Sequence, residues 1–136
     1  MGKPKFSNTI QTVTKNGFYG YKKLRNNQIA KLYVPGGARY YYGECGNGKL
    51  RVSEAKVIWI YNVAKGRFTT KGFSGYNSSF RYSVGKTVRP VGNFSTYLNT
   101  CERGIHMFVN RKRLQTFRMH NLNWTINRYI KLIYPY

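Results

Sequence analysis

Apolar side chains recur at alternate positions or in short runs along most of this chain, and that spacing predicts β-strands. Residues 28–34 form one such segment, which ends at the Pro-Gly-Gly sequence 35–37. The two asparagines at 26–27 predict a turn in front of it, so a hairpin is expected here. Residues 57–61, Val-Ile-Trp-Ile-Tyr, are β-branched or aromatic throughout and predict a central strand.

Two further segments alternate apolar with basic side chains, and each predicts a half-buried strand with a cationic outer face. These are residues 81–89 and 126–134. The apolar run 105–109 indicates a short buried strand, and Asn110 after it is a good N-cap for a helix near 111–120. The predicted fold class is therefore α+β and β-dominated, a single compact domain with a curved antiparallel sheet and one main helix near 111–120.

The length of 136 residues suits one domain. Residues 1–16 are polar and weakly patterned and predict a flexible basic arm, whereas 17–136 form the expected globular domain. No apolar segment of a secretory signal follows Met1, so the protein is not expected to be secreted. Nothing approaches the roughly 18 apolar residues of a membrane span, so no membrane partner is expected.

Charge changes this picture more than any motif does. The chain has 24 Lys and Arg against three acidic residues, for a formal net charge of +21. Few of these cations can find a carboxylate within the fold, so the charge is expected to be neutralised from outside. Nucleic acid is the predicted partner, because phosphate neutralisation releases counterions and gives affinity without sequence readout. DNA is favoured over RNA, and a homo-oligomer is left open.

The cations expected to contact phosphate lie on the predicted strands and around the predicted helix. That helix opens with three basic residues, which is unfavourable at the positive end of a helix dipole unless an anion docks nearby. The alternative is that they are solvated side chains on a basic protein. The predicted nucleic-acid-binding residues are Lys22, Lys23, Arg25, Arg39, Arg81, Lys86, Arg89, Arg111, Lys112, Arg113 and Arg118.

Aromatic residues are abundant, with 13 Tyr, 8 Phe and 2 Trp. They have two interpretations, stacking on unpaired bases or filling the core. Core packing is favoured for roughly two thirds of them. Tyr19, Tyr21 and the three tyrosines at 40–42 are the candidates for stacking, because basic residues adjoin them in the sequence.

Catalytic chemistry has one candidate pair, Cys101 and His106. Their separation of five residues places them on opposite faces of a strand, unless a turn at Gly104 brings them together, and Glu102 is the only carboxylate near them in the sequence. The favoured interpretation is structural, with His106 hydrogen-bonded in the core and Cys101 as a small buried apolar group. A zinc site needs about four ligands, and the spacings of Cys45, Cys101, His106 and His120 match no common site. We therefore expect no enzyme, no metal and no cofactor, with an enzyme built on this pair as the least favoured alternative.

Three segments of the chain together resemble an uncharacterised domain of large DNA viruses and bacteriophages, which often occurs beside pentapeptide repeats. They are residues 49–57, 80–88 and 101–108, within a match over roughly 28–118. The most specific features are Cys-x-x-Gly-Ile-His-x-Phe at 101–108 and Tyr-x-Val-Gly-Lys at 82–86. The resemblance implies a viral origin and a β-rich fold, and it brings no established activity.

Charge and resemblance together predict a non-enzymatic, sequence-independent DNA-binding protein of a large DNA virus. It would coat or condense the genome through phosphate contacts, in the virion or in the viral factory of the host cytoplasm. The alternative is a structural or scaffold protein of the virion or viral factory that binds an acidic protein or RNA.

Overall fold

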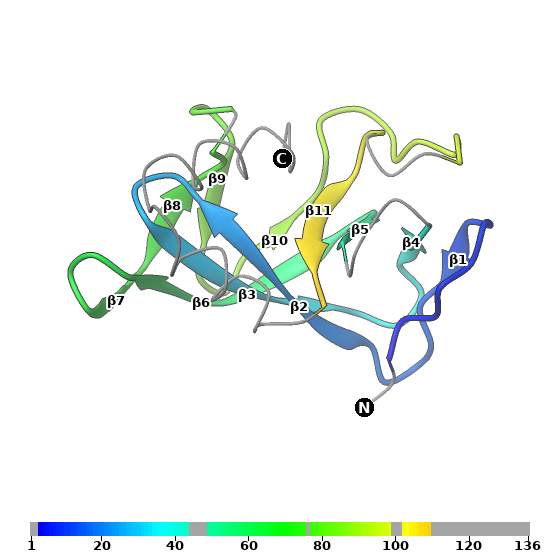
Figure 1. Cartoon of the computed structure of the whole chain (residues 1–136), viewed down its shortest axis with the longest axis horizontal. Helices are drawn as coiled ribbons and strands as arrows, with labels where there is room; N and C mark the ends of the chain where they lie inside the picture. The colour runs from blue at the N-terminus through cyan, green and yellow to red at the C-terminus, as the bar shows by residue number, and fades with distance from the viewer. Residues whose placement is uncertain (1–2, 44–48, 76, 99–101, 110–136) are drawn as a thin grey trace.

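The computed structural model describes residues 3–43, 49–75, 77–98 and 102–109. All strand pairings within these ranges are antiparallel (Figure 1). In chain order the strands are β1 (Gln11–Thr12), β2 (Phe18–Leu24), β3 (Gln28–Val34), β4 (Arg39–Tyr41), β5 (Lys49–Val52), β6 (Ala55–Asn62), β7 (Arg67–Thr69), β8 (Lys71–Phe73), β9 (Arg81–Ser83), β10 (Thr87–Val88) and β11 (Ile105–Phe108).

The predicted α+β class is wrong for the part of the chain that the structure describes, because no helix occurs there. The sequence in these ranges carries the two-residue period of strands almost throughout, and the structure follows it. The main helix expected near 111–120 rested on the Asn110 cap, and both lie outside the described residues. The strand expected at 126–134 lies outside them as well.

The single strand predicted over residues 81–89 is also wrong. β9 pairs with β8, and β10 pairs instead with β6. Between them the chain turns at Gly85, which has a φ of 85°, and the Lys86 backbone N–H donates to the Ser83 carbonyl at 3.0 Å. A positive φ suits glycine, so Gly85 divides a continuous alternating pattern into two strands with different partners.

The central hairpin agrees with the sequence prediction. β2 and β3 pair from Phe18 opposite Val34 to Leu24 opposite Gln28. Asn26 and Asn27 lie in the turn with φ of 63° and 59°, a left-handed conformation that asparagine tolerates better than most residues. The strand expected at 28–34 is β3, and the one expected at 57–61 lies within β6, which pairs with β3.

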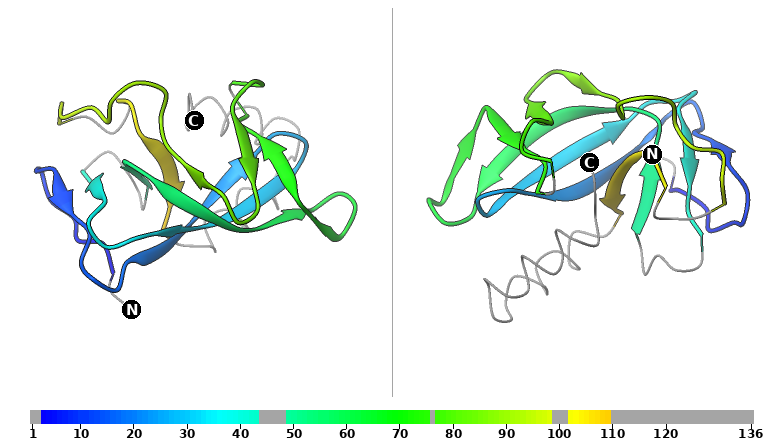
Figure 2. Two further views of the ribbon diagram at one scale, coloured as in Figure 1. Left: turned by 180° about the vertical axis from the view of Figure 1, so that it is seen from behind. Right: turned by 90° about the horizontal axis from the view of Figure 1, so that it is seen from above.

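The larger sheet has the order β1-β4-β5-β11-β2-β3-β6-β10, with β7 beside β6. It is strongly curved (Figure 2), and its two ends enclose the larger of two apolar clusters, with the β8–β9 hairpin over one side. Alternate residues of the strands point into this core, as the pleat requires. Its fully buried members include Leu24, Leu32, Val34, Leu50, Val52, Ile60, Tyr82, Ile105 and Met107. The smaller cluster is built around Ile29 and Phe108.

The segment predicted as an N-terminal arm lies alongside β4 in the structure. The Ser7 backbone N–H donates to the Tyr42 carbonyl at 2.9 Å, and the Phe6 and Tyr42 rings pack edge to face with their centroids 5.4 Å apart. β1 then pairs with β4. These contacts close the β4 edge of the larger sheet.

Arg51 on β5 is fully buried and holds the loop that leads to β11. Its guanidinium donates to the Ser95 carbonyl at 2.7 Å, to the Arg103 carbonyl at 3.0 Å and to the Tyr97 carbonyl. It also lies 4.7 Å from the Phe94 ring centroid. Burial lowers the pKa of Arg51, an effect that nearby Glu102 opposes. Arg51 therefore supplies a donor to the buried Ser95 carbonyl and ties Tyr97 and Arg103 to β5.

Lys22 on β2 is the second buried cation with a defined structural role. Its side chain is 1% exposed, and its ammonium donates to the His106 carbonyl at 3.0 Å. Burial lowers the pKa of Lys22 well below its usual value, and the charge of Lys49 lowers it further. Lys22 thus links β2 to β11 from within the core.

Replacing Arg51 with Met is predicted to destabilise the protein by about 3 kcal/mol, because it removes a charged donor from the buried Ser95 carbonyl and from two partly buried carbonyls. Arg51→Lys should recover little, since one ammonium cannot reproduce the fork of guanidinium donors. Urea unfolding followed by circular dichroism measures both. The control is exposed Arg81→Met, expected to change stability by less than about 0.5 kcal/mol. A loss below about 1 kcal/mol for Arg51→Met would contradict this role.

Lys22→Met tests the buried ammonium through its pH dependence. The folded-state pKa is depressed, so between that value and the usual lysine pKa near about 10.4 the unfolded chain binds more protons. Wild-type stability must therefore rise with pH across this window, relative to the variant. If Lys22→Met has a larger free energy of unfolding than the wild type near neutral pH, that difference should shrink toward about pH 10. Urea unfolding over this range measures the difference. A difference that does not change with pH would contradict the assignment, and exposed Lys71→Met controls for the lost charge.

Candidate nucleic-acid interface

Strands β2, β3 and β6 present two faces of opposite character. One face packs into the core with residues such as Leu24, Ala30, Leu32 and Ile60, all fully buried. Successive side chains of a strand point to opposite sides, so the intervening residues lie on the other side of the sheet. That side, with the matching residue of β7, is called the outer face. Its aromatic and basic members are Tyr19, Tyr21, Lys23, Lys31, Tyr33, Lys56, Trp59, Tyr61 and Phe68. Lys56 and Trp59 share this side because a register shift next to Lys31 leaves Ile58 of β6 without a partner on β3.

Strand register arranges these side chains in rows across the sheet. In the first row Lys31 lies directly opposite both Tyr21 and Trp59. The two rings approach each other at a centroid distance of 6.2 Å, and the Lys31 ammonium lies over the Tyr19 ring instead. In the second row Tyr33 lies opposite Tyr19 and Lys56. These rows are a consequence of backbone hydrogen bonding and not of a flexible loop.

The third row runs from β2 to β7 and begins with Lys23, which is buried opposite Ile29. Tyr61 lies opposite Ile29 on one side and Phe68 on the other. Ile29 is the one aliphatic residue among the three, and its side chain is buried. The row therefore ends in two adjacent rings at the β7 edge of the sheet.

Ring contacts hold the outer face together. Its centre is a buried apolar cluster of Ile29 and Phe108 with Tyr21 and Trp59 packed against it, and the face is exposed at Lys56 and at the β7 edge. Phe68 packs against Tyr61 and Trp59 at centroid distances of 5.0 and 5.8 Å, with the rings nearly perpendicular, yet 65% of Phe68 is exposed. Tyr19 and Tyr33 pack at 5.3 Å, and the Lys31 ammonium lies 4.4 Å from the Tyr19 ring centroid. Lys56 is exposed, and Lys31 is half-buried.

Three of the predicted phosphate contacts, on and after β2, are buried or half-buried. Lys22 and Lys23 are buried, at 1% and 6% exposure. Arg25 is half-buried, and its guanidinium donates to the carbonyls of Ser74 and Gly75 at 3.3 and 3.0 Å. It therefore ties the β2–β3 turn to the segment after β8. Basic residues adjacent in sequence at 22–25 do not form one exposed patch.

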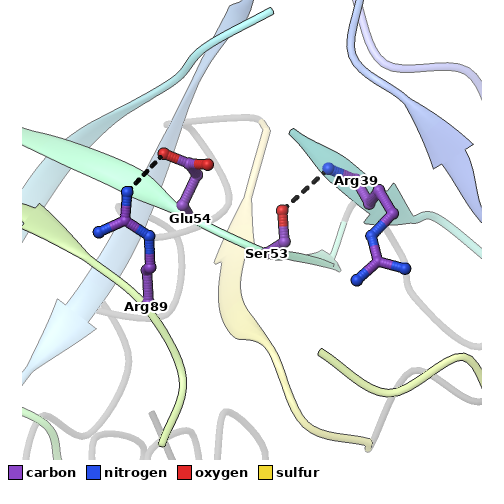
Figure 3. A network of polar contacts seen from close by, with 4 residues as sticks. All are labelled: Arg39, Ser53, Glu54 and Arg89. Atoms are coloured by element: carbon purple, nitrogen blue, oxygen red, sulfur yellow. Dashed lines mark hydrogen bonds and ion pairs between the residues drawn. The ribbon is translucent and has the colours of Figure 1, made fainter. Parts of the chain in front are cut away.

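The remaining predicted cations that the structure describes are exposed but dispersed. Arg39 is on β4, Arg81 on β9, and Lys86 and Arg89 flank β10. Figure 3 shows two of them: Arg89 forms an ion pair with Glu54 at 3.3 Å, whereas the Arg39 backbone N–H donates to the Ser53 hydroxyl. The predicted contacts around the helix lie outside the described residues; they are Arg111, Lys112, Arg113 and Arg118.

The aromatic candidates divide in the same way. Tyr40 and Tyr41 are buried, and Tyr42 packs against Phe6, so these tyrosines support the β4 region. Tyr19 and Tyr21 do lie on the outer face. Sequence reasoning missed the basic and aromatic residues that complete this face: Lys31, Tyr33, Lys56, Trp59, Tyr61 and Phe68. Their alternation in 29–33 and 59–61 was the available signal, because it places rings and cations on the side away from Leu32 and Ile60.

The proposed catalytic pair has one member that the structure describes. His106 is fully buried on β11 opposite Arg51, and its carbonyl accepts from Lys22, whereas Cys101 lies outside the described residues. Among the described residues no group of three or more His, Cys, Asp or Glu side chains is placed to hold a metal ion. The same part of the chain contains no helix long and apolar enough to span a membrane.

Comparison with known proteins supplies a family but no activity. No curated protein and no solved structure matches this chain. A family model matches residues 8–113, which include every strand from β1 to β11, and the expectation of an uncharacterised domain is thereby confirmed. Because this match covers more than half of the sequence, the chain belongs to the family of unknown function DUF5758.

Proposed function

We propose that this protein binds nucleic acid without reading its sequence and that the outer face is its main contact surface. One observation carries the proposal: Lys31 and Lys56 stand in register with accessible aromatic rings on one side of β2, β3, β6 and β7. Phosphates would meet the ammonium groups and nucleotides would meet the rings. The net charge of +21 supplies attraction at longer range.

Sequence-independent binding follows from the chemistry of this face. Lysine ammonium groups are strong partners for phosphate, and phosphate contacts position a protein without distinguishing bases. Every base has a π-face, so aromatic stacking is also tolerant of sequence. The proposed role is non-catalytic, since the buried imidazole of His106 belongs to the core strand β11.

The resemblance to a domain of large DNA viruses and bacteriophages supports a finer form of the proposal. In that form the protein coats or condenses a viral DNA genome, within the virion or the viral factory. A protein with 24 basic and three acidic residues repels its own copies, so close packing of many copies requires a polyanion between them. A DNA genome meets that requirement.

Removing the two outer-face cations is predicted to weaken binding and to flatten its salt dependence. The variant is Lys31→Ser/Lys56→Ser, and fluorescence anisotropy with labelled single strands and duplexes of unrelated sequence measures it. Log affinity should fall linearly with log salt for the wild type, and the slope should drop by about 1.4 to 1.8 in the variant, or about 0.7 to 0.9 per lost phosphate contact.

The matched control is Lys71→Ser/Arg81→Ser, which also removes two positive charges. Both residues are exposed on the side of the β8–β9 hairpin that points away from Tyr82 and the core. This control should keep most of the wild-type slope. Equal decreases of affinity and salt slope in the two variants would show that total charge decides binding. The outer face would then not be the main contact surface. Absence of any binding at low salt would refute the function itself.

A further inference from the structure

We infer that the ligand of the outer face is single-stranded nucleic acid, whose bases stack on Tyr19, Tyr33, Tyr61 and Phe68 while Lys31 and Lys56 hold the phosphates. This inference rests on the proposed function and makes it more specific. Duplex and single strand share a phosphate backbone, so the cations alone do not discriminate between them. The discrimination comes from the rings.

The aromatic rings of the outer face cannot stack on the bases of a paired duplex. In a duplex the π-faces of the bases are stacked on each other, and a protein reaches only base edges and backbone. A single strand exposes those faces, and aromatic side chains between cations are the usual way to bind it. Phe68 is 65% exposed and packs against the rings of Trp59 and Tyr61 on the neighbouring strand β6. Burial in the core therefore does not explain its position.

The rings are already ordered before a ligand arrives. Phe68 is held by Trp59 at an interplanar angle of 78° and by Tyr61 at 72°. Tyr33 is fixed by a hydrogen bond from its hydroxyl to the Asn16 carbonyl at 3.1 Å. Side chains fixed in this way lose little rotamer freedom on binding, which favours affinity. The β-ladder thus presents a stacking platform and not a set of mobile side chains.

Cations and rings lie side by side on this face, as the binding of a nucleotide chain requires. The Lys31 ammonium lies over the Tyr19 ring, 4.4 Å from its centroid. Lys56 ends the row of Tyr19 and Tyr33. A single strand presents phosphate and base in alternation, so one strand lying across these rows would satisfy both groups. An acidic protein surface would engage the cations and leave the rings without a partner.

Three probes of about 20 nucleotides, long enough for most single-strand binding sites, separate these ligands. They are oligodeoxythymidine, an abasic strand of the same length and charge, and a duplex of the same length. Anisotropy titrations at one salt concentration should show oligodeoxythymidine binding at least about tenfold tighter than the abasic strand, and tighter than the duplex. Equal affinity for thymidine and abasic strands, or preference for the duplex, would overturn the inference and leave the proposed function intact. Binding to none of the probes would remove both.

Removing rings tests the same inference from the protein side. Tyr61→Leu/Phe68→Leu should weaken oligodeoxythymidine binding about tenfold or more and change abasic-strand binding less than about twofold. The matched control is Phe6→Leu/Tyr97→Leu, which removes two exposed rings elsewhere, at 56% and 75% exposure, and should leave both affinities within about twofold.

Folding of each variant is checked by circular dichroism and thermal unfolding. If the double variant fails to fold, Tyr19→Leu replaces it, with the same selective loss expected for the thymidine strand. An equal loss on both strands in a folded variant would show that the rings do not stack on bases, and the inference would be wrong.

Discussion

The antiparallel register of β2, β3 and β6 is the constraint on which both the core and the outer face depend. The core requires Leu24, Ala30 and Ile60 on one side, and the pleat then sends their neighbours to the other. A slip of one residue would bury the cations and rings and expose the core. The Asn26–Asn27 turn helps to fix the register, because both residues adopt the left-handed conformation that the short connection needs.

Backbone carbonyls take the place of the carboxylates that this sequence lacks. With three acidic residues against 24 basic ones, buried cations need other acceptors. Lys22 donates to the His106 carbonyl, Arg25 to two carbonyls near β8, and Arg51 to three in the loop before β11. A carbonyl is a weaker partner than a carboxylate, so burial still lowers the pKa of Lys22 and Arg51. Net charge therefore overstates how many cations an outside partner can reach.

Local pattern was enough to find β3, the centre of β6 and the turn between β2 and β3, since period two and Asn-Asn are direct consequences of backbone geometry. It was not enough to place the cations. Lys31 alternates with Ala30 and Leu32, but Lys22 is followed by Lys23, so the local pattern does not say which of these two lysines lies in the core. The burial of Lys22 beside β11 follows from pairing with a distant strand, which a single sequence does not reveal. The prediction of one strand at 81–89 was wrong for a related reason. The turn at Gly85 divides one alternating pattern into β9, which pairs with β8, and β10, which pairs with β6.

Dispersed charge and an ordered sheet face make different contributions to binding. Exposed cations such as Arg81, Lys86 and Arg103 belong to different strands and loops and to no common row, so they attract a polyanion without orienting it. That attraction is also the part that salt screens. Ring stacking depends less on salt and occurs only where rings are held in register, as on the outer face. In the proposed complex, charge therefore governs the rate of encounter. The register of the β-strands determines which surface of the protein binds the nucleic acid.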